Sequence, residues 1–371
     1  RAVGLPDLHP GRGIPIGAAF AFAGVIEPAL VGGDAGCGVR VVGVPRPRRG
    51  GDALGRRLDK ATRGPALPHC DPQALLDAVW ADGPAGLARV AGVPERLAAL
   101  AEADPPADPA PPSGPVPPEI TAHFAEQLGT AGGGNHFLEV AQVTSVEDPA
   151  AGRAGLVPHG VAVLAHSGSR GLGGVIGRAW AGQRLSDPEA QATYLGQLAG
   201  AVRFARANRL ILAWRALEAL GCARPDRIGG TFDVVHNDVQ PWGLAGEAVW
   251  LHRKGAAPAE AGQLTVVLGS RGAPSVVMEG SGRADCLCSV AHGAGRRMGR
   301  SEAVAKLKPR FKRAELQRTA LGGEVLCDDA ELLYAEHPRA YKPVEPVVDS
   351  LVAAGLARPV ARLVPRFTVK R

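Results

Sequence analysis

The chain has 371 residues and a formal net charge of +6. Hydrophobic residues make up 46% and charged residues 21%, which excludes a wholly disordered chain. The 50 glycines and 32 prolines show no Gly-x-y period, so collagen is excluded and a globular protein with many tight loops is predicted. Aromatic residues are scarce at 4%, which argues against broad base-stacking platforms.

Nothing in the sequence predicts a membrane partner. The longest apolar stretch, 18–31, is interrupted by Glu27 and by glycines, so no transmembrane helix is expected, and no signal peptide is recognised. The chain opens with Arg1 rather than Met, which predicts that a leading segment is missing. Its six cysteines include no Cys-x-x-Cys pair, so the sequence predicts a reducing cytoplasm and no disulfide framework.

The first third of the chain divides by composition. Residues 1–50 are punctuated by glycines and carry one clear strand pattern at 39–44, whereas 53–103 show helical spacing of leucines and valines. Residues 104–118 are rich in proline and predict an exposed, semi-rigid loop. This segment is either a domain boundary or an insertion in one domain, and the insertion is favoured.

The remainder mixes strands and helices without regular alternation. A short helix is predicted after Glu119, and Ser186–Glu189 reads as a capping box that opens a long helix ending near Gly221. The other predicted elements are strands at 161–165, 232–235, 248–252, 264–268 and 275–278 and helices at 314–320 and 344–354. No internal repeat occurs, and the pattern predicts an α+β fold with a mixed sheet.

Polar residues with metal-binding chemistry recur beside predicted strands and glycine clusters. Asp34 and Cys37 share one glycine loop, His136 follows three glycines, and His166 and His236 each end a strand. Strand ends far apart in sequence can converge on one cleft, and this donor set suits one or two divalent transition-metal ions with a bridging thiolate. Each residue alone is more typical of a structural role: a satisfied histidine, a packed cysteine, or a turn-capping aspartate.

His292 stands between small residues and precedes Arg296, Arg297 and Arg300. An approachable imidazole beside arginines is what a histidine nucleophile toward phosphorus requires. The alternative is a tight surface turn before a basic helix. Glycine-rich segments elsewhere could bind phosphate, but none matches a P-loop or a Rossmann fingerprint.

Taken together, these motifs resemble the RtcB family of RNA ligases. The segments that carry the resemblance occur in family order over almost the whole chain: PDLHPGRG (6–13), GGDAGCG (32–38), GTAGGGNHFLEV (129–140), AHSGSRGLG (165–173), HND (236–238), HRKGA (252–256), LGSRG (268–272), AHGAGRRMGR (291–300) and AYKPV (340–344), with Lys370 near the end. Arg271, Ala291 and Asp238 depart from the usual family residues, as in a divergent branch such as the subgroup associated with a peptide-release-factor-like protein.

The resemblance implies a single large domain over 1–371, with mixed sheets flanked by helices and an active site in a central cleft. It implies GTP as co-substrate, two Mn²⁺ ions, and RNA partners with 3′-phosphate or 2′,3′-cyclic phosphate ends and 5′-hydroxyl ends. A histidine–GMP intermediate would activate the RNA end in RNA repair or tRNA splicing. A metal-dependent phosphodiesterase or phosphatase and a non-catalytic RNA-binding relative stay open as alternatives.

The resemblance also assigns roles to residues. It makes His292 the nucleophile that carries GMP, and Asp7 the acid that orients it. The metal ligands would be Asp34, Cys37, His136, His166 and His236. The nucleotide-binding residues would be Asn135, Glu139, Ser270, Ser275, Gly293, Gly295, Arg296, Tyr341 and Lys370, and Arg170 and Arg253 would bind phosphate or RNA.

Overall fold

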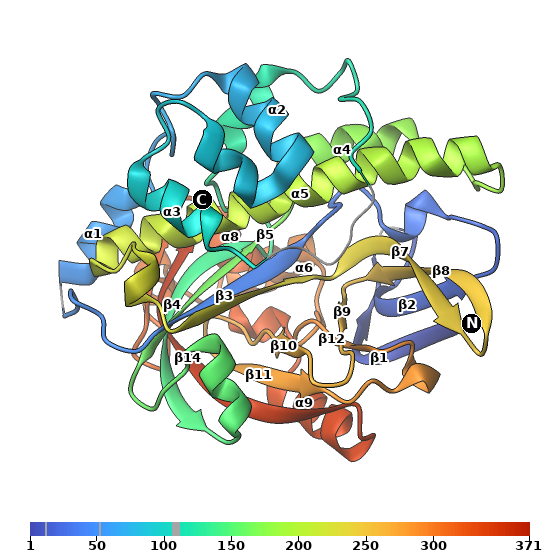
Figure 1. The fold of residues 1–371 in the computed structure, drawn as a ribbon. Helices are drawn as coiled ribbons and strands as arrows, with labels where there is room; N and C mark the ends of the chain where they lie inside the picture. Colours follow the sequence, from blue (N-terminus) through green and yellow to red (C-terminus); the bar gives the residue numbers. More distant parts are fainter. Residues whose placement is uncertain (12, 52, 106–111) are drawn as a thin grey trace.

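The computed structural model describes residues 1–11, 13–51, 53–105 and 112–371, and its architecture is α+β as predicted (Figure 1). The largest sheet has the strand order β10-β11-β14-β4-β5-β3-β6, with β13 beside β14. Neighbouring strands are antiparallel except β13 and β14, which run parallel, so the predicted mixed sheet is confirmed. Its strands are β3 (Gly38–Val44), β4 (Phe137–Val146), β5 (Val161–Ser167), β6 (Gly230–Val235), β10 (Leu264–Val267), β11 (Ser275–Gly280), β13 (Glu324–Cys327) and β14 (Ala357–Lys370).

Both faces of this sheet are buried, which explains the almost continuous apolar runs of its central strands. On β5, Val163 and Ala165 belong to the core beneath the helices, whereas Ala162 and Leu164 belong to a second core on the opposite face. The predicted strands at 39–44, 161–165, 232–235 and 275–278 lie within β3, β5, β6 and β11.

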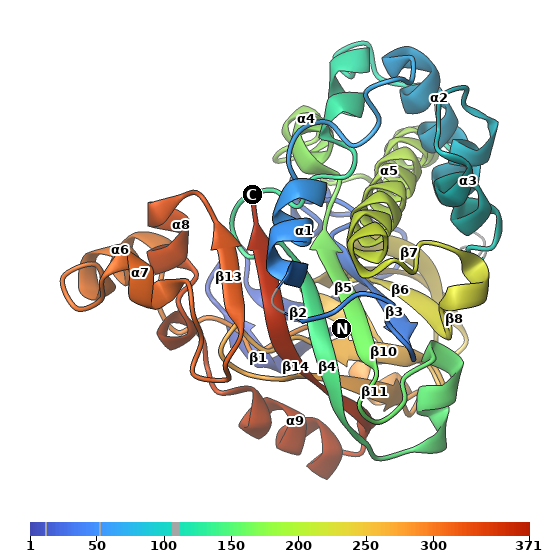
Figure 2. The same cartoon turned by 90° about the vertical axis from the view of Figure 1, so that its left-hand side faces the viewer.

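A layer of helices covers one face of the large sheet (Figure 2). The predicted helical region 53–103 is confirmed, but it is divided into several pieces. The layer consists of α1 (Ala53–Ala61), α2 (Pro72–Asp82), a 3₁₀ turn at Gly83–Arg89, α3 (Glu95–Glu102), α4 (Arg170–Ala179) and α5 (Pro188–Leu220).

The long helix α5 begins one residue later than the capping box predicts. The carboxylate of Asp187, not the hydroxyl of Ser186, accepts a hydrogen bond from the Ala190 amide at 2.8 Å. The helix ends where Gly221 adopts a left-handed conformation (φ 71°), as its sequence predicts. None of the helices in the described part of the chain is both long and apolar enough to cross a membrane.

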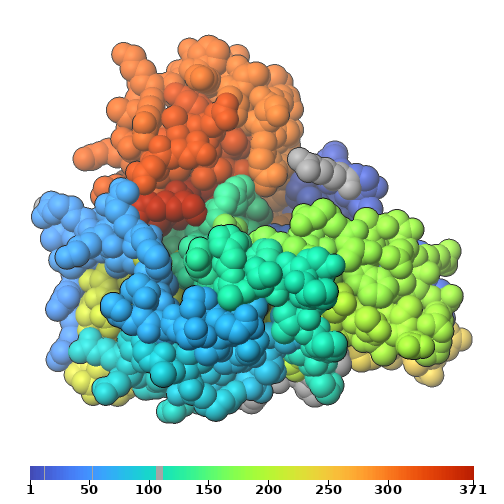
Figure 3. All heavy atoms as spheres, turned by 90° about the horizontal axis from the view of Figure 1, so that it is seen from above, coloured from blue at the N-terminus to red at the C-terminus, as the bar shows by residue number. Residues whose placement is uncertain are grey.

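A smaller sheet and a helical lobe complete the fold. The smaller sheet has the order β1-β2-β8-β7, and β9 pairs with β12 beside it. The lobe around α6 to α8 has its own apolar core and projects from one side of the molecule (Figure 3). The bounds are β1 (Ala2–His9), β2 (Ile16–Phe22), β7 (Asn237–Leu244), β8 (Glu247–Lys254), β9 (Ala256–Pro258), β12 (Ser289–Ala291), α6 (Arg300–Leu307), α7 (Arg313–Leu316), α8 (Ala330–Ala335) and α9 (Val344–Ala353).

Two local predictions need correction. The helix predicted at 314–320 is only the single turn α7, and the short helix predicted after Glu119 is a 3₁₀ segment at Ala122–Gln127. The remaining 3₁₀ segments are Pro28–Leu30, Pro149–Ala154, Pro225–Arg227, Ala284–Cys286 and Pro338–Ala340.

The proline-rich segment 104–118 is anchored at the ends that the structure describes, and its residues 106–111 lie outside the described part. Asp104 pairs with the buried guanidinium of Arg40. At the other end, the indole Nε1 of Trp80 donates to the Gly114 carbonyl at 2.7 Å. The described ends of this segment are therefore partly buried, and the prediction of an exposed loop is wrong for these ends.

The crossing of α2 over α5 depends on one glycine. A Cβ on Gly200 would collide with the indole carbons of Trp80, which is 3% exposed and held by Gly114. We expect Gly200→Ala to lower the free energy of unfolding by about 1–2 kcal/mol, because overpacking outweighs the gain in helix propensity. Gly174→Ala in α4 is the control, because its Cβ would meet only the flexible end of Arg178. This variant should raise the free energy of unfolding by up to about 1 kcal/mol. Urea unfolding measures both, and equal effects would contradict this account.

Candidate active site

Five strand ends meet at one edge of the large sheet. The antiparallel register pairs Phe137 at the start of β4 with His166 near the end of β5, and Gly38 at the start of β3 with Ser167. Gly38 also pairs with Val235 at the end of β6, and Val369 of β14 pairs with Leu138. The residues flanking these ends, which include Cys37, His136, His236 and Lys370, therefore arrive at the same place.

The five candidate metal ligands form one cluster centred on a sulfur atom. Sγ of Cys37 lies 3.2 Å from Nε2 of His136, 3.5 Å from Nε2 of His166 and 3.2 Å from Nε2 of His236. Nε2 of His136 lies 3.1 Å from Oδ2 of Asp34. The donor atoms form two groups of three that share the thiol: Cys37, His166 and His236, and Asp34, Cys37 and His136.

Burial favours the neutral form of two imidazoles of this cluster, those of His166 and His236. Burial holds the pKa values of His166 and His236 well below their ordinary value, so both rings are free to donate a lone pair. Burial acts to raise the pKa of Asp34, but the neighbouring His136 outweighs it and keeps that pKa below its usual range. Burial and the Asp34 carboxylate raise the pKa of the Cys37 thiol well above its ordinary value, an effect that a bound cation would oppose.

This donor set fits a transition-metal ion. Imidazole nitrogens, a thiol and a carboxylate are the usual ligands of such ions, and their donor atoms already lie within 4.8 Å of one another in each group of three. The shared sulfur fits two adjacent ions better than one, because each group of three contains it.

A fourth histidine, His292, stands beside the three histidines of the cluster. The ring of His292 lies edge-on to the ring of His236, with centroids 4.8 Å apart. Its Nδ1 lies 2.7 Å from Oδ2 of the fully buried Asp7 on β1, although the pair is not aligned as a hydrogen bond. The approach of the two segments requires Gly295 (φ 75°), since a Cβ there would collide with the Asp7 carbonyl. The orientation leaves Nε2 of His292 as the nitrogen not facing Asp7.

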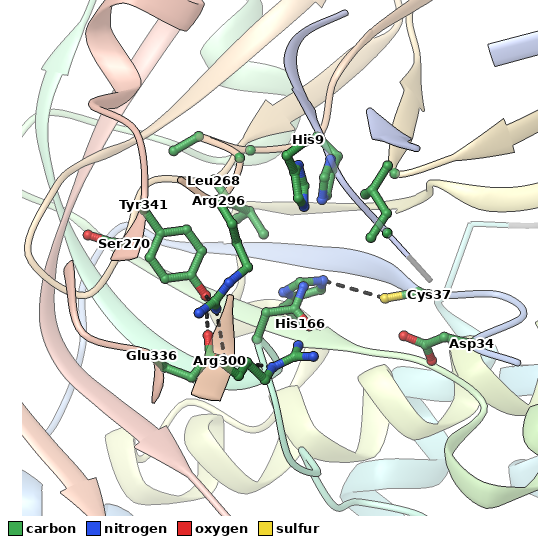
Figure 4. Close-up of a pocket in the computed structure, with 18 of the residues that line it drawn as sticks. His9, Asp34, Cys37, His166, Leu268, Ser270, Arg296, Arg300, Glu336 and Tyr341 are labelled. Atoms are coloured by element: carbon green, nitrogen blue, oxygen red, sulfur yellow. Dashed lines mark hydrogen bonds and ion pairs between the residues drawn. The ribbon is translucent and has the colours of Figure 1, made fainter. Parts of the chain in front are cut away.

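A cavity of about 1020 Å³ is lined by Asp34, Cys37, His166, His236 and His292, whereas His136 and Asp7 lie behind its surface. Figure 4 shows Asp34 and Cys37 on one side of it and Ser270, Tyr341 and Glu336 on the other. The cavity is large enough for a nucleotide together with further ligand atoms.

A polar network forms the side of the cavity opposite the metal-capable cluster. The buried Glu336 accepts hydrogen bonds from Arg296 and Arg300, each at 3.1 Å, and from the Tyr341 hydroxyl. The Arg296 guanidinium also lies over the Tyr341 ring, 4.9 Å from its centroid. Burial acts to raise the pKa of Glu336, but the charges of Lys370, Arg296 and Arg300 and the Tyr341 hydrogen bond outweigh it and hold that pKa below its ordinary value. A rigid ring and a fixed positive charge therefore face the cavity.

The ends of β14 and β4 supply two more buried charged groups. Nζ of Lys370 donates to the His136 carbonyl at 2.8 Å, and burial lowers its pKa to about 8. Glu139 accepts a hydrogen bond from the Thr368 hydroxyl at 2.9 Å, and burial raises its pKa to about 7. The hydrogen bond from Lys370 thus fixes the backbone of the candidate metal ligand His136.

Most of the predicted nucleotide-binding residues line the cavity: Asn135, Glu139, Ser270, Gly293, Gly295, Arg296, Tyr341 and Lys370. Ser275 does not line it, because its buried hydroxyl accepts a hydrogen bond from the Gly269 amide at 3.1 Å and fixes the turn that carries Ser270. Arg253 is 1% exposed and donates to Ser289 and Cys288, so it is not placed to contact RNA. Arg170 (φ 60°) donates to the Thr130 hydroxyl and lies across Gly132 rather than lining the cavity.

Several lining residues were not predicted from the sequence, and three of them carry polar side chains with defined partners. His9 has its Nδ1 2.8 Å from the Asp7 carbonyl, Lys254 donates to the Val31 carbonyl, and Glu336 organises the arginines. His9 and Lys254 belong to the family-like motifs PDLHPGRG (6–13) and HRKGA (252–256), so the sequence could have indicated them as site residues. Glu336 lies in no such motif, and only its tertiary contacts reveal it.

Glu139 makes stability depend on pH. Its pKa is about 7 in the folded chain and about 4.5 when unfolded, so between these values the folded state holds a proton that the unfolded state has lost. Its contribution to the free energy of unfolding therefore falls as pH rises through this window. The free energy of unfolding of Glu139→Gln, taken relative to that of the unmodified chain at the same pH, should therefore rise by about 2–3 kcal/mol from pH 4 to pH 8. Urea unfolding at both pH values measures this, and the exposed Glu119→Gln should show no such trend.

The geometry defines a class of protein: one with a metal-capable cluster of histidines and a cysteine, beside a histidine held by a buried carboxylate. A family model for "tRNA-splicing ligase RtcB" matches residues 1–187 and 183–371. The chain belongs to the RtcB family.

Individual relatives support the same assignment over full length. The chain is 36% identical to "RNA-splicing ligase RtcB2" of Escherichia coli, covering 100% of this chain and 88% of the relative. It is 31% identical to "RNA-splicing ligase RtcB" of Mycobacterium tuberculosis, covering 99% and 96% respectively. It is 30% identical to "tRNA-splicing ligase RtcB" of Aeropyrum pernix, covering 97% and 86%.

Proposed function

We propose that this protein is a GTP- and Mn²⁺-dependent RNA ligase that joins 3′-phosphate or 2′,3′-cyclic phosphate ends to 5′-hydroxyl ends, in RNA repair or tRNA splicing. The observation that carries this proposal is the position of His292. It lies against Asp7 on one side and beside the His236 ring of the metal-capable cluster on the other, in one cavity. Membership of the RtcB family adds independent support.

Asp34, Cys37, His136, His166 and His236 would hold the metal ions. Bound there, Mn²⁺ would neutralise charge on phosphate oxygens close to His292. The chain's own contribution is to keep the imidazoles of His166 and His236 neutral by burial and to present the thiol to both groups of three.

His292 would act as the nucleophile. With Nδ1 facing Asp7, its Nε2 would attack the α-phosphorus of GTP, forming a P–N bond and breaking the P–O bond to the β-phosphate, so that pyrophosphate leaves. Asp7 would fix the ring's tautomer and balance the positive charge that develops on it.

The activated guanylate would then pass to RNA. An oxygen of the RNA 3′-phosphate would attack the same phosphorus, breaking the P–N bond and returning His292 to its free form. The RNA 5′-hydroxyl would finally attack the 3′-phosphate, expelling GMP and forming a 3′,5′ phosphodiester. A 2′,3′-cyclic phosphate would first be opened by water.

The remaining cavity residues would bind the nucleotide. Asn135 and Glu139 would lie at the phosphates, while Gly293 and Gly295 leave the approach to His292 unobstructed. Arg296 would neutralise phosphate charge. Ser270, Tyr341 and Lys370 would contact the guanine, with Ser275 acting through the turn that holds Ser270.

Incubation with GTP labelled at the α-phosphate and Mn²⁺ tests the proposal. We expect an acid-labile protein–GMP adduct that disappears on addition of pyrophosphate. A metal-dependent phosphodiesterase would process RNA ends without such an adduct, and a non-catalytic RNA-binding relative would do neither. Either of those two outcomes would overturn the proposed function.

A further inference from the structure

Two adjacent residues on α5, Asn208 and Arg209, lie behind the metal-capable cluster, and each is 0% exposed. Neither lines the cavity. Both are polar residues in the middle of a long helix, so their partners explain their burial.

Arg209 connects three segments that carry candidate ligands. Its Nη1 donates to the Gly36 carbonyl at 2.7 Å and to the Ser167 carbonyl at 2.8 Å. Its Nε and Nη2 donate to the two carboxylate oxygens of Asp233 on β6 at 2.8 and 2.6 Å. Gly36 precedes Cys37, Ser167 follows His166, and Asp233 lies three residues before His236.

Asn208 connects the fourth segment. Its side-chain oxygen accepts hydrogen bonds from the amides of Gly129 and Thr130 at 2.7 and 3.2 Å. Its side-chain nitrogen donates to the Ser167 hydroxyl at 3.0 Å. Residues 129–134 form the glycine loop that leads into His136, so this contact joins the His136 loop to the end of β5.

The planar guanidinium is required for this arrangement. Four hydrogen bonds in three directions match the fixed fork of arginine, which a lysine ammonium cannot reproduce. The close packing supports this, because a Cβ on Gly38 would lie 3.1 Å from Cζ of Arg209. The backbone on either side of Cys37 is therefore fitted around the guanidinium.

We infer that Asn208 and Arg209 are positioning residues that set the mutual spacing of Cys37, His136, His166 and His236, so that the loops form a metal site before a metal arrives. The inference rests on the proposed metal-dependent function. Residues behind metal ligands commonly influence affinity by 10–100-fold, because they fix ligand orientation.

The test compares metal binding by the full chain and by Arg209→Lys. We expect Arg209→Lys to bind Mn²⁺ about 10–100-fold more weakly in titration calorimetry. With Co²⁺ as a probe, the thiolate-to-cobalt absorption should weaken or shift, which a purely structural role would not cause in a folded protein. Circular dichroism establishes that each variant is folded.

Arg215→Lys is the matched control. Arg215 lies on the same helix, is 4% exposed, and donates to the backbone carbonyls of Ala61, Arg63 and Gly64. Its fourth acceptor is the carbonyl of Gly129, the residue of the 129–134 loop that is farthest in sequence from His136, so it contacts the ligand-bearing segments at one peripheral point. The Arg215→Lys variant should have a lower free energy of unfolding without a comparable loss of Mn²⁺ affinity. If Arg209→Lys does not fold, Ser167→Ala decides, because it removes only the hydroxyl that links Asn208 to the Ala131 carbonyl.

The outcomes separate the two proposals. If the unmodified chain binds neither Mn²⁺ nor Co²⁺, the proposed function loses its metal site. If the unmodified chain binds both, and the folded variants bind with unchanged affinity and an unchanged cobalt spectrum, the positioning role is wrong. Equal losses of Mn²⁺ affinity in Arg209→Lys and Arg215→Lys would also overturn the positioning role.

Discussion

His292→Ala is expected to form no protein–GMP adduct and to leave RNA ends with a 3′-phosphate unjoined. The His292 imidazole lies beside the metal-capable cluster, and its position against Asp7 leaves its other nitrogen facing away from that carboxylate. Its neighbours Ala291 and Gly293 are small, so removal of the ring should spare the fold. The same variant should still join an RNA supplied with a 3′-terminal GMP cap, because that step follows the nucleophile's action.

Asp7→Asn tests the same guanylylation step with a milder change, in the partner of His292 rather than in His292 itself. It keeps the shape of the side chain but removes the charge that balances the imidazolium, so guanylylation should slow by about 10²-fold or more. Joining of the capped RNA should be affected less. His123→Ala is the control, since that ring is exposed, contacts Glu126 and Phe124, and does not line the cavity.

The position of the adduct decides the mechanism. Mass spectrometry of the guanylylated protein should place GMP on His292. An adduct on Lys254 or Lys370, the two cavity-lining lysines, would show that the histidine mechanism is wrong for this chain.

Cys37→Ser is expected to have the second large effect. The thiol belongs to both groups of three candidate ligands, so its loss should weaken binding at both positions together. A serine hydroxyl does not ionise near neutral pH and is a poor substitute for a thiolate. We expect Mn²⁺ affinity to fall at least 10–100-fold and guanylylation to fall with it.

Cys70→Ser is the matched control for this variant. Cys70 is also buried, but it lies in the core of the helical layer and does not line the cavity. It should lower stability slightly and leave metal affinity unchanged. Unchanged Mn²⁺ affinity in Cys37→Ser would rule out a thiolate shared between two ions.

The sequence by itself determined the α+β class and most elements that bury a regular pattern. The strand β5 was predictable because it is a short, continuous apolar run with β-branched residues, which suits a buried strand. The long helix α5 was predictable because capping signals at 186–189 open it and Gly221 ends it. His166 and His236 were visible because each ends a predicted strand, and Asp34, Cys37 and His136 were visible because glycines stand beside them. Side chains that approach a ligand closely need neighbours without bulk, and glycine marks such places in the sequence.

Only the tertiary structure decided how these residues meet. The starts of β3 and β4 lie beside the ends of β5, β6 and β14 because the sheet is antiparallel, and no local pattern specifies that strand order. Glu336, Asn208 and Arg209 gain their roles from partners tens to hundreds of residues away. Ser275 loses its predicted place in the cavity for the same reason, because its hydroxyl is taken by the Gly269 amide. Hydrogen bonds between distant segments depend on packing geometry, which residue spacing along one segment does not encode.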